Sequence, residues 1–283
     1  MNACAGQTKI EVNLHHKVAV VTGAGRGLGR RTAITLAAHG VRVVLVARNA
    51  EQLLETEEAI KRAGGIATAM PADVSEAEAV EKLKTTIEQR FGTVSILINA
   101  AGIFGPIQLI SESEPKRWLE TMAVNLFGPY LTCRAFVGRM IQAGWGRILN
   151  FTSAASLHPP GPLNSAYGTS KVALNQFTRH LAAELEGTGV TANVLHPGDV
   201  KTEMWATIAA ESEQLGSEAE AYRKWVRWVA ETGGDDPQKA ADLVLRVMSD
   251  EASTINGQFL WIEKGLQPPL PAWGDATSTQ PWR

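Results

Sequence analysis

Cysteine is scarce in this sequence of 283 residues, which contains only two, Cys4 and Cys133. Two cysteines so far apart provide neither a disulfide framework nor the spacing of a zinc site, and the apolar neighbours of Cys133 predict a packing role. Long hydrophobic runs are also missing: no segment approaches the length of a membrane span, and the polar N-terminal stretch contains no signal-peptide core. We therefore expect a soluble protein of a reducing compartment, the cytoplasm, with no membrane partner.

An excess of one charge is absent as well. The chain has 27 basic and 29 acidic residues, a formal net charge of −2 and a pI near 6.3. This balance gives no electrostatic reason to expect nucleic acid as a partner. His158 and His196 have no cluster of other ligands around them, so we expect no metal site and a structural role for His196.

What the chain has instead is an alternation of valine-rich segments with helical ones. Strands are expected at 17–22, 41–47, 66–70, 94–98, 146–151, 190–195 and 257–262, and helices at 27–39, 50–64, 76–91, 115–143, 165–186 and 237–249. This alternation predicts an α/β fold in three layers, a doubly wound parallel sheet of about seven strands with helices on both faces.

The predicted domain organisation is simple. An N-terminal extension, 1–16, precedes one domain over 17–264, and an irregular tail rich in Pro and Gly, 265–283, follows it. Within the domain, the insertion 203–234 breaks the alternation and should form helices that act as a lid.

The segment 18–29 reads as a short strand, a glycine-rich turn and the start of a helix. Glycine lets the backbone approach a ligand closely, and the unpaired N–H groups of a helix N-terminus attract anions. The segment therefore predicts a site for the diphosphate of a dinucleotide, although alone it could be a plain tight turn. The loop residues expected to line this site are Gly23, Gly25, Arg26, Gly27, Leu28 and Gly29.

The second strand ends in Ala47 and Arg48, where a site that prefers NAD usually has an acidic residue. No carboxylate is present here, whereas Arg48 and Arg26 provide two guanidinium groups that can grip a 2′-phosphate. This chemistry favours NADP over NAD. The alternative is that both arginines are solvated surface charges.

Two further strands end in residues suited to the adenosine half of such a cofactor. Asp73 and Val74 follow the third strand, where the carboxylate could accept a hydrogen bond from the adenine amino group. Small residues close the fourth strand and let the chain pass close to a ribose. These residues are Asn99, Ala100, Ala101 and Gly102. Each could be an ordinary turn, but open α/β sheets bind ligands at the carboxyl ends of neighbouring strands.

Tyr167 and Lys171 lie four residues apart in a segment of helical periodicity, so they share one face. A cation beside a phenol stabilises the phenolate, and we expect Lys171 to lower the pKa of Tyr167 toward the neutral range, where it can transfer a proton. Ser153, at the end of the fifth strand, adds a hydroxyl at the same edge of the sheet. A surface pair and a turn serine are the alternatives.

Asn125 is expected in the middle of a helix. Because Pro129 has no N–H, the Asn125 carbonyl loses its helical partner and could hold a water. We hypothesise that this water links Lys171 to solvent as a proton relay. A simple kink in the helix is the alternative.

Together these motifs resemble the short-chain dehydrogenase/reductase family, in order and approximate spacing, over residues 17–264. The shared motifs are Thr22-Gly23-x-x-x-Gly27-x-Gly29, Asn99-Ala100-Ala101-Gly102, Asn125, Ser153, Tyr167-x-x-x-Lys171 and Pro197-Gly198. The sequence is similar to the single-domain branch of the family. The resemblance implies a Rossmann fold and hydride transfer between a nicotinamide cofactor and a substrate carbon.

The resemblance also implies a role for each residue. Tyr167 would exchange a proton with the substrate oxygen, and Ser153 would hydrogen-bond that oxygen. Lys171 would lower the tyrosine pKa and bind the nicotinamide ribose, and Asn125 would complete the proton relay. The further cofactor contacts implied are Pro197, Gly198, Val200 and Thr202, whose hydroxyl would meet the carboxamide.

Two positions depart from the family pattern. Ala100 replaces a second asparagine, which removes one side chain that organises the backbone. Ser153 also precedes Tyr167 by one residue more than expected, which an extra residue in the loop 157–162 would explain. Ser156 is therefore the other candidate for the serine role.

The substrate is expected to be a hydrophobic ketone or secondary alcohol, interconverted by an NADP-dependent carbonyl reductase similar to 3-oxoacyl reductases. The residues behind this expectation are an apolar stripe at helical spacing in the insertion, Tyr222, Trp225, Val226 and Val229, with Met204, Trp205, Phe104 and Pro106 near it. Such a stripe could equally be core packing.

Two other functions stay open: a dinucleotide-binding sensor or scaffold without turnover, and a dehydratase or epimerase that uses the same residues. Relatives commonly associate through the helices that correspond to 115–143 and 165–186. The resemblance therefore implies a homodimer or homotetramer.

Overall fold

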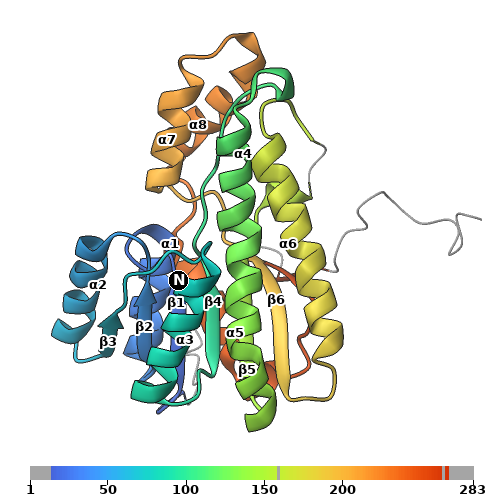
Figure 1. The fold of residues 1–283 in the computed structure, drawn as a ribbon. Helices are drawn as coiled ribbons and strands as arrows, with labels where there is room; N and C mark the ends of the chain where they lie inside the picture. The colour runs from blue at the N-terminus through green and yellow to red at the C-terminus, as the bar shows by residue number, and fades with distance from the viewer. Residues whose placement is uncertain (1–13, 158–159, 263–264, 268–283) are drawn as a thin grey trace, which may run out of the picture.

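The computed structural model describes residues 14–157, 160–262 and 265–267, the last three in backbone only. In this part of the chain one sheet has the strand order β3-β2-β1-β4-β5-β6-β7-β8 (Figure 1). The strands are β1 Val18–Thr22, β2 Arg42–Val46, β3 Ile66–Ala69, β4 Ile96–Asn99, β5 Gly146–Phe151, β6 Val190–His196, β7 Phe259–Trp261 and β8 Gly265–Gln267. The first seven are parallel, which confirms the doubly wound sheet.

The order reverses between β1 and β4, which pair directly: Val21 lies opposite Ile98 and Thr22 opposite Asn99. In open α/β sheets the crevice at this switch point is the usual ligand site. The fold thus places the glycine loop after β1 next to the small residues after β4.

β8 lies in the segment expected to be irregular and runs antiparallel to β7, with Leu266 opposite Leu260. That expectation is wrong for 265–267. A three-residue edge strand is held by backbone hydrogen bonds, so it needs little side-chain pattern and leaves little trace in the sequence. The rest of the predicted tail and most of the N-terminal extension lie outside the described residues.

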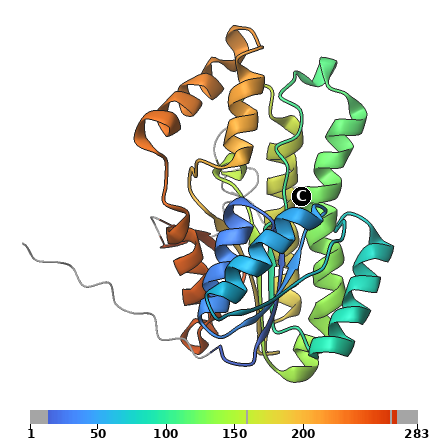
Figure 2. The same cartoon turned by 90° about the vertical axis from the view of Figure 1, so that its left-hand side faces the viewer.

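Helices cover both faces of the sheet (Figures 1 and 2). Successive side chains of a strand point to opposite faces. Ala19 and Val21 accordingly pack with α1, α2 and α9, and Val18 and Val20 with α3, α5 and α6. The helices are α1 Gly27–Ala38, α2 Ala50–Arg62, α9 Pro237–Met248, α3 Ala77–Phe91, α5 Gly128–Ala143 and α6 Ser165–Glu184. Short 3-10 turns lie at Ile110–Glu112, Ala154–Ser156, Ser217–Ala219 and Asp250–Ala252.

The helix expected at 115–143 is not one continuous α-helix. It divides into α4 Pro115–Met122, a π-helical turn η2 Ala123–Phe127, and α5. Within η2 the N–H of Gly128 donates to the carbonyl of Ala123, five residues earlier. Pro129 cannot donate a helical hydrogen bond, and a widened turn accommodates the missing donor. The π turn contains Asn125.

The insertion after β6 forms α7 Glu203–Ser212 and α8 Glu220–Thr232, joined by η4 Ser217–Ala219. Both helices rise above the sheet beside α4 and are coloured orange in Figure 1. They have a small core of their own, in which Ile208, Ala219 and Val226 pack with Ile107 and Leu163. The predicted helices of the insertion are confirmed.

Candidate active site

The glycine loop after β1 packs too closely for larger residues. Gly23 has a φ of +68°, and a Cβ added there would lie 2.8 Å from the Ala101 nitrogen. A Cβ at Gly29, in the first turn of α1, would lie 2.3 Å from the Gly23 carbonyl oxygen. The glycines therefore hold the start of α1 against the sheet and leave the space above the loop open.

The N-terminus of α1 has no capping side chain and no acidic residue in its first turn. By contrast, α2 is capped by the Asn49 carboxamide, whose oxygen accepts from the N–H of Gln52 at 3.0 Å. An uncapped helix start leaves its N–H groups available to an anion and keeps the positive end of the helix dipole unneutralised. These groups line a cleft of about 370 Å³.

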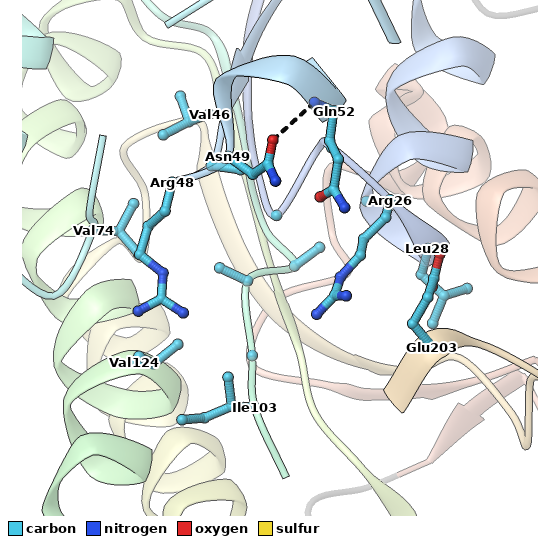
Figure 3. Close-up of a pocket in the computed structure, with 18 of the residues that line it drawn as sticks. Arg26, Leu28, Val46, Arg48, Asn49, Gln52, Val74, Ile103, Val124 and Glu203 are labelled. Carbon is cyan, nitrogen blue, oxygen red and sulfur yellow. Dashed lines mark hydrogen bonds between the residues drawn. The ribbon is translucent and has the colours of Figure 1, made fainter. Parts of the chain in front are cut away.

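Most of the predicted cofactor residues meet at this cleft (Figure 3). The predicted residues that line it are Gly23, Gly25, Arg26, Gly27, Leu28, Gly29, Arg48, Asp73, Val74, Ala100, Ala101, Gly102 and Thr202. Sequence reasoning missed Asn49 and Gln52, although Asn49 directly follows Arg48 and Gln52 lies one helical turn further on. It also missed Ile103, Val124 and Glu203, which come from three separate segments.

The two arginines enter the cleft from opposite walls, Arg26 from the glycine loop and Arg48 from the end of β2 (Figure 3). The Nη1 atom of Arg48 lies 3.8 Å from Asp73 Oδ2 and 3.7 Å from Glu120 Oε1. The other Asp73 oxygen accepts from the Ser75 N–H at 2.9 Å and its hydroxyl at 2.6 Å. Asp73 thus holds its own loop and Arg48, in addition to lining the cleft.

Asn99 is placed away from the cleft. Its side chain is buried, donates to Asn150 Oδ1 at 2.9 Å and accepts from the Thr132 hydroxyl at 2.8 Å. Asn150 in turn donates to the Thr178 hydroxyl at 2.8 Å. This buried network ties β4 and β5 to α5 and α6. Asn99 therefore fixes the strands beneath the site, and it is not among the residues that line the cleft.

A second cavity, of about 530 Å³, adjoins the cleft and contains Ser153, Tyr167 and Lys171. Tyr167 and Lys171 are both buried on α6, with the Lys171 nitrogen 5.5 Å from the centre of the tyrosine ring. Lys171 donates to the carbonyl of Phe151 at 2.8 Å. The ammonium group is thus held at the end of β5, beside the phenol and next to Gly102.

The expected lowering of the Tyr167 pKa is wrong for this structure. Burial raises the pKa of Tyr167, and a hydrogen bond with Ser153 offsets only part of the increase. Burial also lowers the pKa of Lys171 to about 8. Burial thus disfavours the charged form of both groups, which opposes the lowering expected from the neighbouring cation.

Asn125 faces the loop after β4, with a fully buried side chain. Its amide accepts from the Ile103 N–H at 2.9 Å and donates to the Ile103 carbonyl at 2.9 Å and to the Ser170 hydroxyl at 3.0 Å. Asn125 therefore links the cofactor side of the sheet to α6, next to Lys171. Ser170, which completes this link, was not expected; it lies among the residues of the Tyr-Lys segment.

The two candidate serines differ clearly. Ser153 lines the second cavity, accepts from the Ala155 N–H at 3.2 Å, and offsets part of the rise in the Tyr167 pKa. Ser156 instead donates to the Ser153 carbonyl at 2.6 Å and accepts from Asn175 at 2.9 Å. This geometry favours Ser153, because Ser156 does not line the cavity and its hydroxyl donates to a backbone carbonyl.

The segment after β6 joins the two cavities. Pro197, Gly198 and Val200 line the second cavity, and Thr202 lines both. The Thr202 hydroxyl accepts from the Trp205 N–H at 3.4 Å and caps α7. The position predicted to contact the cofactor is therefore also the N-cap of the first helix of the insertion.

The predicted apolar stripe divides into pocket and core. Tyr222 and Trp225 line the second cavity, whereas Val226 and Val229 are buried in packing. Of the other four expected residues, Phe104, Met204 and Trp205 line the cavity, and Pro106 does not. Asp199, His196 and Glu218 also line it and were not expected.

His196 has structural contacts: its Nδ1 accepts from the Ala154 N–H at 3.2 Å, and its ring lies edge-on to Trp261 at 4.7 Å. His158 lies outside the described residues.

Residues 14–157 and 160–262 contain no group of three or more His, Cys, Asp or Glu placed to hold a metal. No helix in the described part of the chain is long and apolar enough to cross a membrane.

Comparisons with known proteins agree with this geometry. A family model described as "short chain dehydrogenase" matches residues 17–213. The chain is 36% identical to the short-chain reductase protein NovJ of Streptomyces niveus over 260 residues, which cover 91% of this chain and 96% of that protein.

Two solved structures are similar over nearly the whole chain. A variant of actinorhodin polyketide ketoreductase with NADPH has a TM-score of 0.79 and 30% identity, covering 87% of this chain and 95% of its own. An NAD⁺-bound xylitol dehydrogenase has a TM-score of 0.80 and 26% identity, covering 88% and 98%. One of these relatives is described with NADPH and the other with NAD⁺.

Proposed function

The chain belongs to the short-chain dehydrogenase/reductase family and is an NAD(P)-dependent oxidoreductase that acts on carbonyl and alcohol groups. From this premise we propose that it reduces a hydrophobic ketone to a secondary alcohol with NADPH. The observation that carries the proposal is the adjacency of two cavities. The cofactor cleft and the cavity of Tyr167 share Leu28, Ala100, Gly102, Thr202 and Met204 in their walls. The nicotinamide ring of a cofactor bound in the cleft would then face a substrate in the second cavity.

A dinucleotide fits the residues of the cleft. The glycine loop leaves room that a Cβ would fill, and the uncapped start of α1 offers N–H groups to a diphosphate. Arg26 and Arg48 would hold a 2′-phosphate, and no carboxylate follows β2 directly at Ala47. This arrangement supports NADP over NAD. When bound, the cofactor supplies or accepts the hydride.

The protein's own part is to hold the substrate oxygen and move a proton. Tyr167 would donate its phenolic proton to that oxygen, and Ser153 would hydrogen-bond it. Because burial raises its pKa, Tyr167 stays protonated at neutral pH, the form needed to reduce a ketone. Below about pH 8, the charged Lys171 would stabilise the oxygen anion and bind the nicotinamide ribose.

Asn125 would act by position, holding the loop at Ile103 and the helix at Ser170 around Lys171. Its place in a π-helical turn supports the proposed water relay, since such turns leave irregular backbone at functional sites. Removing the side chain with Asn125→Leu should lower turnover. Unchanged turnover would contradict the relay.

We propose a homodimer or homotetramer that forms through the α4 to α6 side. Exposed apolar side chains support this assignment: Leu119 is 61% exposed, Phe127 51% and Tyr130 46%. Light scattering at micromolar protein should give a multiple of the 30.4 kDa chain mass. A cytoplasmic location also stays a prediction, which subcellular fractionation would check.

The proposed function is tested by titrating the protein with NADPH and NADH, then following NADPH oxidation with a panel of ketones. We expect tighter binding of NADPH and formation of one secondary alcohol for each NADPH consumed. Tight binding with no oxidation by any ketone would instead favour a sensor. A product formed without net NADPH consumption would favour dehydration or epimerisation.

A further inference from the structure

One wall of the second cavity is made of aromatic rings that begin at Tyr167, the proposed proton donor. The Phe104 ring lies 4.7 Å from the Tyr167 ring at an interplanar angle of 32°. It also meets the Tyr222 ring of α8 edge-on at 6.0 Å. A continuous aromatic surface thus runs from the proton donor to the lid, and flat rings pack well on such a surface.

Two tryptophans extend this surface, and other groups fix their positions. The indole N–H of Trp225 donates to Asp199 Oδ1 at 3.1 Å, which ties α8 to the segment after β6. Trp205, from α7, lies under the Lys201 ammonium group, 5.0 Å from its ring. Because Ile208, Ala219 and Val226 pack the lid behind these rings, the surface is ordered in advance of a substrate.

Acidic side chains outnumber basic ones in the lining of this cavity. Among the described residues, the charged side chains that line it are Lys171, Asp199 and Glu218. Lys171 is at the reaction end and already donates to the Phe151 carbonyl. The described residues that line the lid end therefore include two carboxylates and no Lys or Arg, and the Lys201 ammonium group, which does not line the cavity, lies 5.0 Å from the centre of the Trp205 ring. Glu218 is exposed at the rim, where its Oε1 accepts from the Gly216 N–H at 3.2 Å.

We infer that this cavity takes an uncharged ketone carried on a flat aromatic ring system, and that Asp199 and Glu218 disfavour substrates with an anionic group remote from the ketone. The inference rests on the proposed function and specifies its substrate. A carboxylate or phosphate at the lid end would lose water, meet no Lys or Arg among the described residues that line it, and face like charges. An aromatic ketone would instead bury its rings in a cavity of about 530 Å³, a typical volume for a ligand site.

The test uses a matched pair of ketones, 2-acetylnaphthalene and 6-acetyl-2-naphthoate, which differ by one carboxylate. Calorimetry with the NADP-loaded protein measures binding, and NADPH oxidation measures kcat/KM. We expect the neutral ketone to bind and react at least about tenfold better, a difference of about 1.4 kcal/mol. Equal or tighter binding of the carboxylate would overturn the inference.

Two substitutions test the charges directly. Asp199→Asn keeps an acceptor for the Trp225 N–H but removes the charge, and Glu218→Gln does the same at the rim. Each should raise the ratio of carboxylate to neutral kcat/KM about two- to fivefold, the size of an exposed charge interaction. Glu213→Gln, an exposed acid of the same lid that does not line the cavity, is the control.

A ratio that moves equally in Glu213→Gln would overturn the inference, since a general charge effect would then explain it. Binding that discriminates between the two ketones while neither oxidises NADPH would leave the inference standing and contradict the proposed reductase function. Failure of both ketones to bind would overturn the inference whatever other ketones the enzyme reduces.

Discussion

The cofactor cleft and the substrate cavity are built in different ways. The cleft lies on the sheet: most of its wall follows β1, β2, β3 and β4, where backbone pairing and glycine contacts hold the chain, and Val124 and residues 202–204 complete it. The substrate cavity lies between the sheet and the lid, and its far wall comes from α7 and α8 with a small core of their own. Recognition of the cofactor therefore depends on the backbone, and recognition of the substrate depends on side chains.

This difference predicts how each half responds to mutation. Side chains at the junction, Tyr167 and Lys171, should change the chemistry by orders of magnitude. Arginines at the cleft should change the choice of cofactor, because the glycine loop still holds the diphosphate. Lid residues should change the substrate and leave cofactor binding almost intact. Four substitutions, from the largest expected effect to the smallest, test this division.

Tyr167→Phe should have the largest effect. It removes the proposed proton donor but keeps a ring to pack against Phe104. We expect kcat for ketone reduction to fall by about 10²- to 10⁴-fold, with a small change in the NADPH Kd. Tyr222→Phe, in the same cavity, is the matched control. A similar loss in both variants would show that general packing explains the result.

Lys171→Met should lower kcat by roughly 10²-fold and change the pH profile. In the wild type, Lys171 is charged below its pKa of about 8, so reduction should weaken as pH rises through that value. The variant should lack this limb. A profile with the same limb in both proteins would assign it to another group.

The same substitution should have the opposite effect on stability. The folded pKa of Lys171, about 8, is below the unfolded value of about 10.4, so the buried ammonium group destabilises the fold at pH 7. Stability should rise between these two pH values in the wild type. Lys171→Met should gain up to about 3 kcal/mol at pH 7 in urea denaturation.

Arg48→Leu should affect the cofactor choice. Arg48 is 59% exposed and already lies near Asp73 and Glu120, so solvent and both carboxylates weaken its attraction for a phosphate. We expect the NADPH Kd to rise about five- to tenfold, with the NADH Kd almost unchanged. Arg30→Leu removes a charge from α1 that does not line the cleft and serves as control. A parallel loss of NADH affinity would mean that Arg48 does not distinguish the two cofactors.

Trp225→Phe should have the smallest effect. It keeps an aromatic ring but removes the 3.1 Å hydrogen bond to Asp199. We expect KM for an aromatic ketone to rise about two- to fivefold, the value of one hydrogen bond, with the NADPH Kd unchanged. Steady-state kinetics and cofactor titration measure both quantities. A change in cofactor affinity would show that the cofactor cleft and the substrate cavity are coupled, which would contradict the division described above.

The same division explains what the sequence could predict. The strand, turn and helix around Gly23 are local, so the residues of the glycine loop are neighbours in the sequence and their spacing could be recognised. The lid wall joins Phe104, Trp205 and Trp225 from three distant segments, and periodicity alone could not separate Trp225 from buried Val226. The direction of the Tyr167 pKa shift could not be predicted either, because burial of the phenol depends on the whole fold.

A single-turnover experiment with the NADPH-loaded enzyme and 2-acetylnaphthalene, comparing the wild type with Tyr167→Phe, tests most directly whether Tyr167 is the proton donor. We predict that the wild type oxidises its bound NADPH and forms one alcohol per cofactor. The variant should bind both ligands and react at least about 100-fold more slowly. If the variant oxidises NADPH at the wild-type rate, Tyr167 is not the proton donor where the cofactor cleft and the substrate cavity meet.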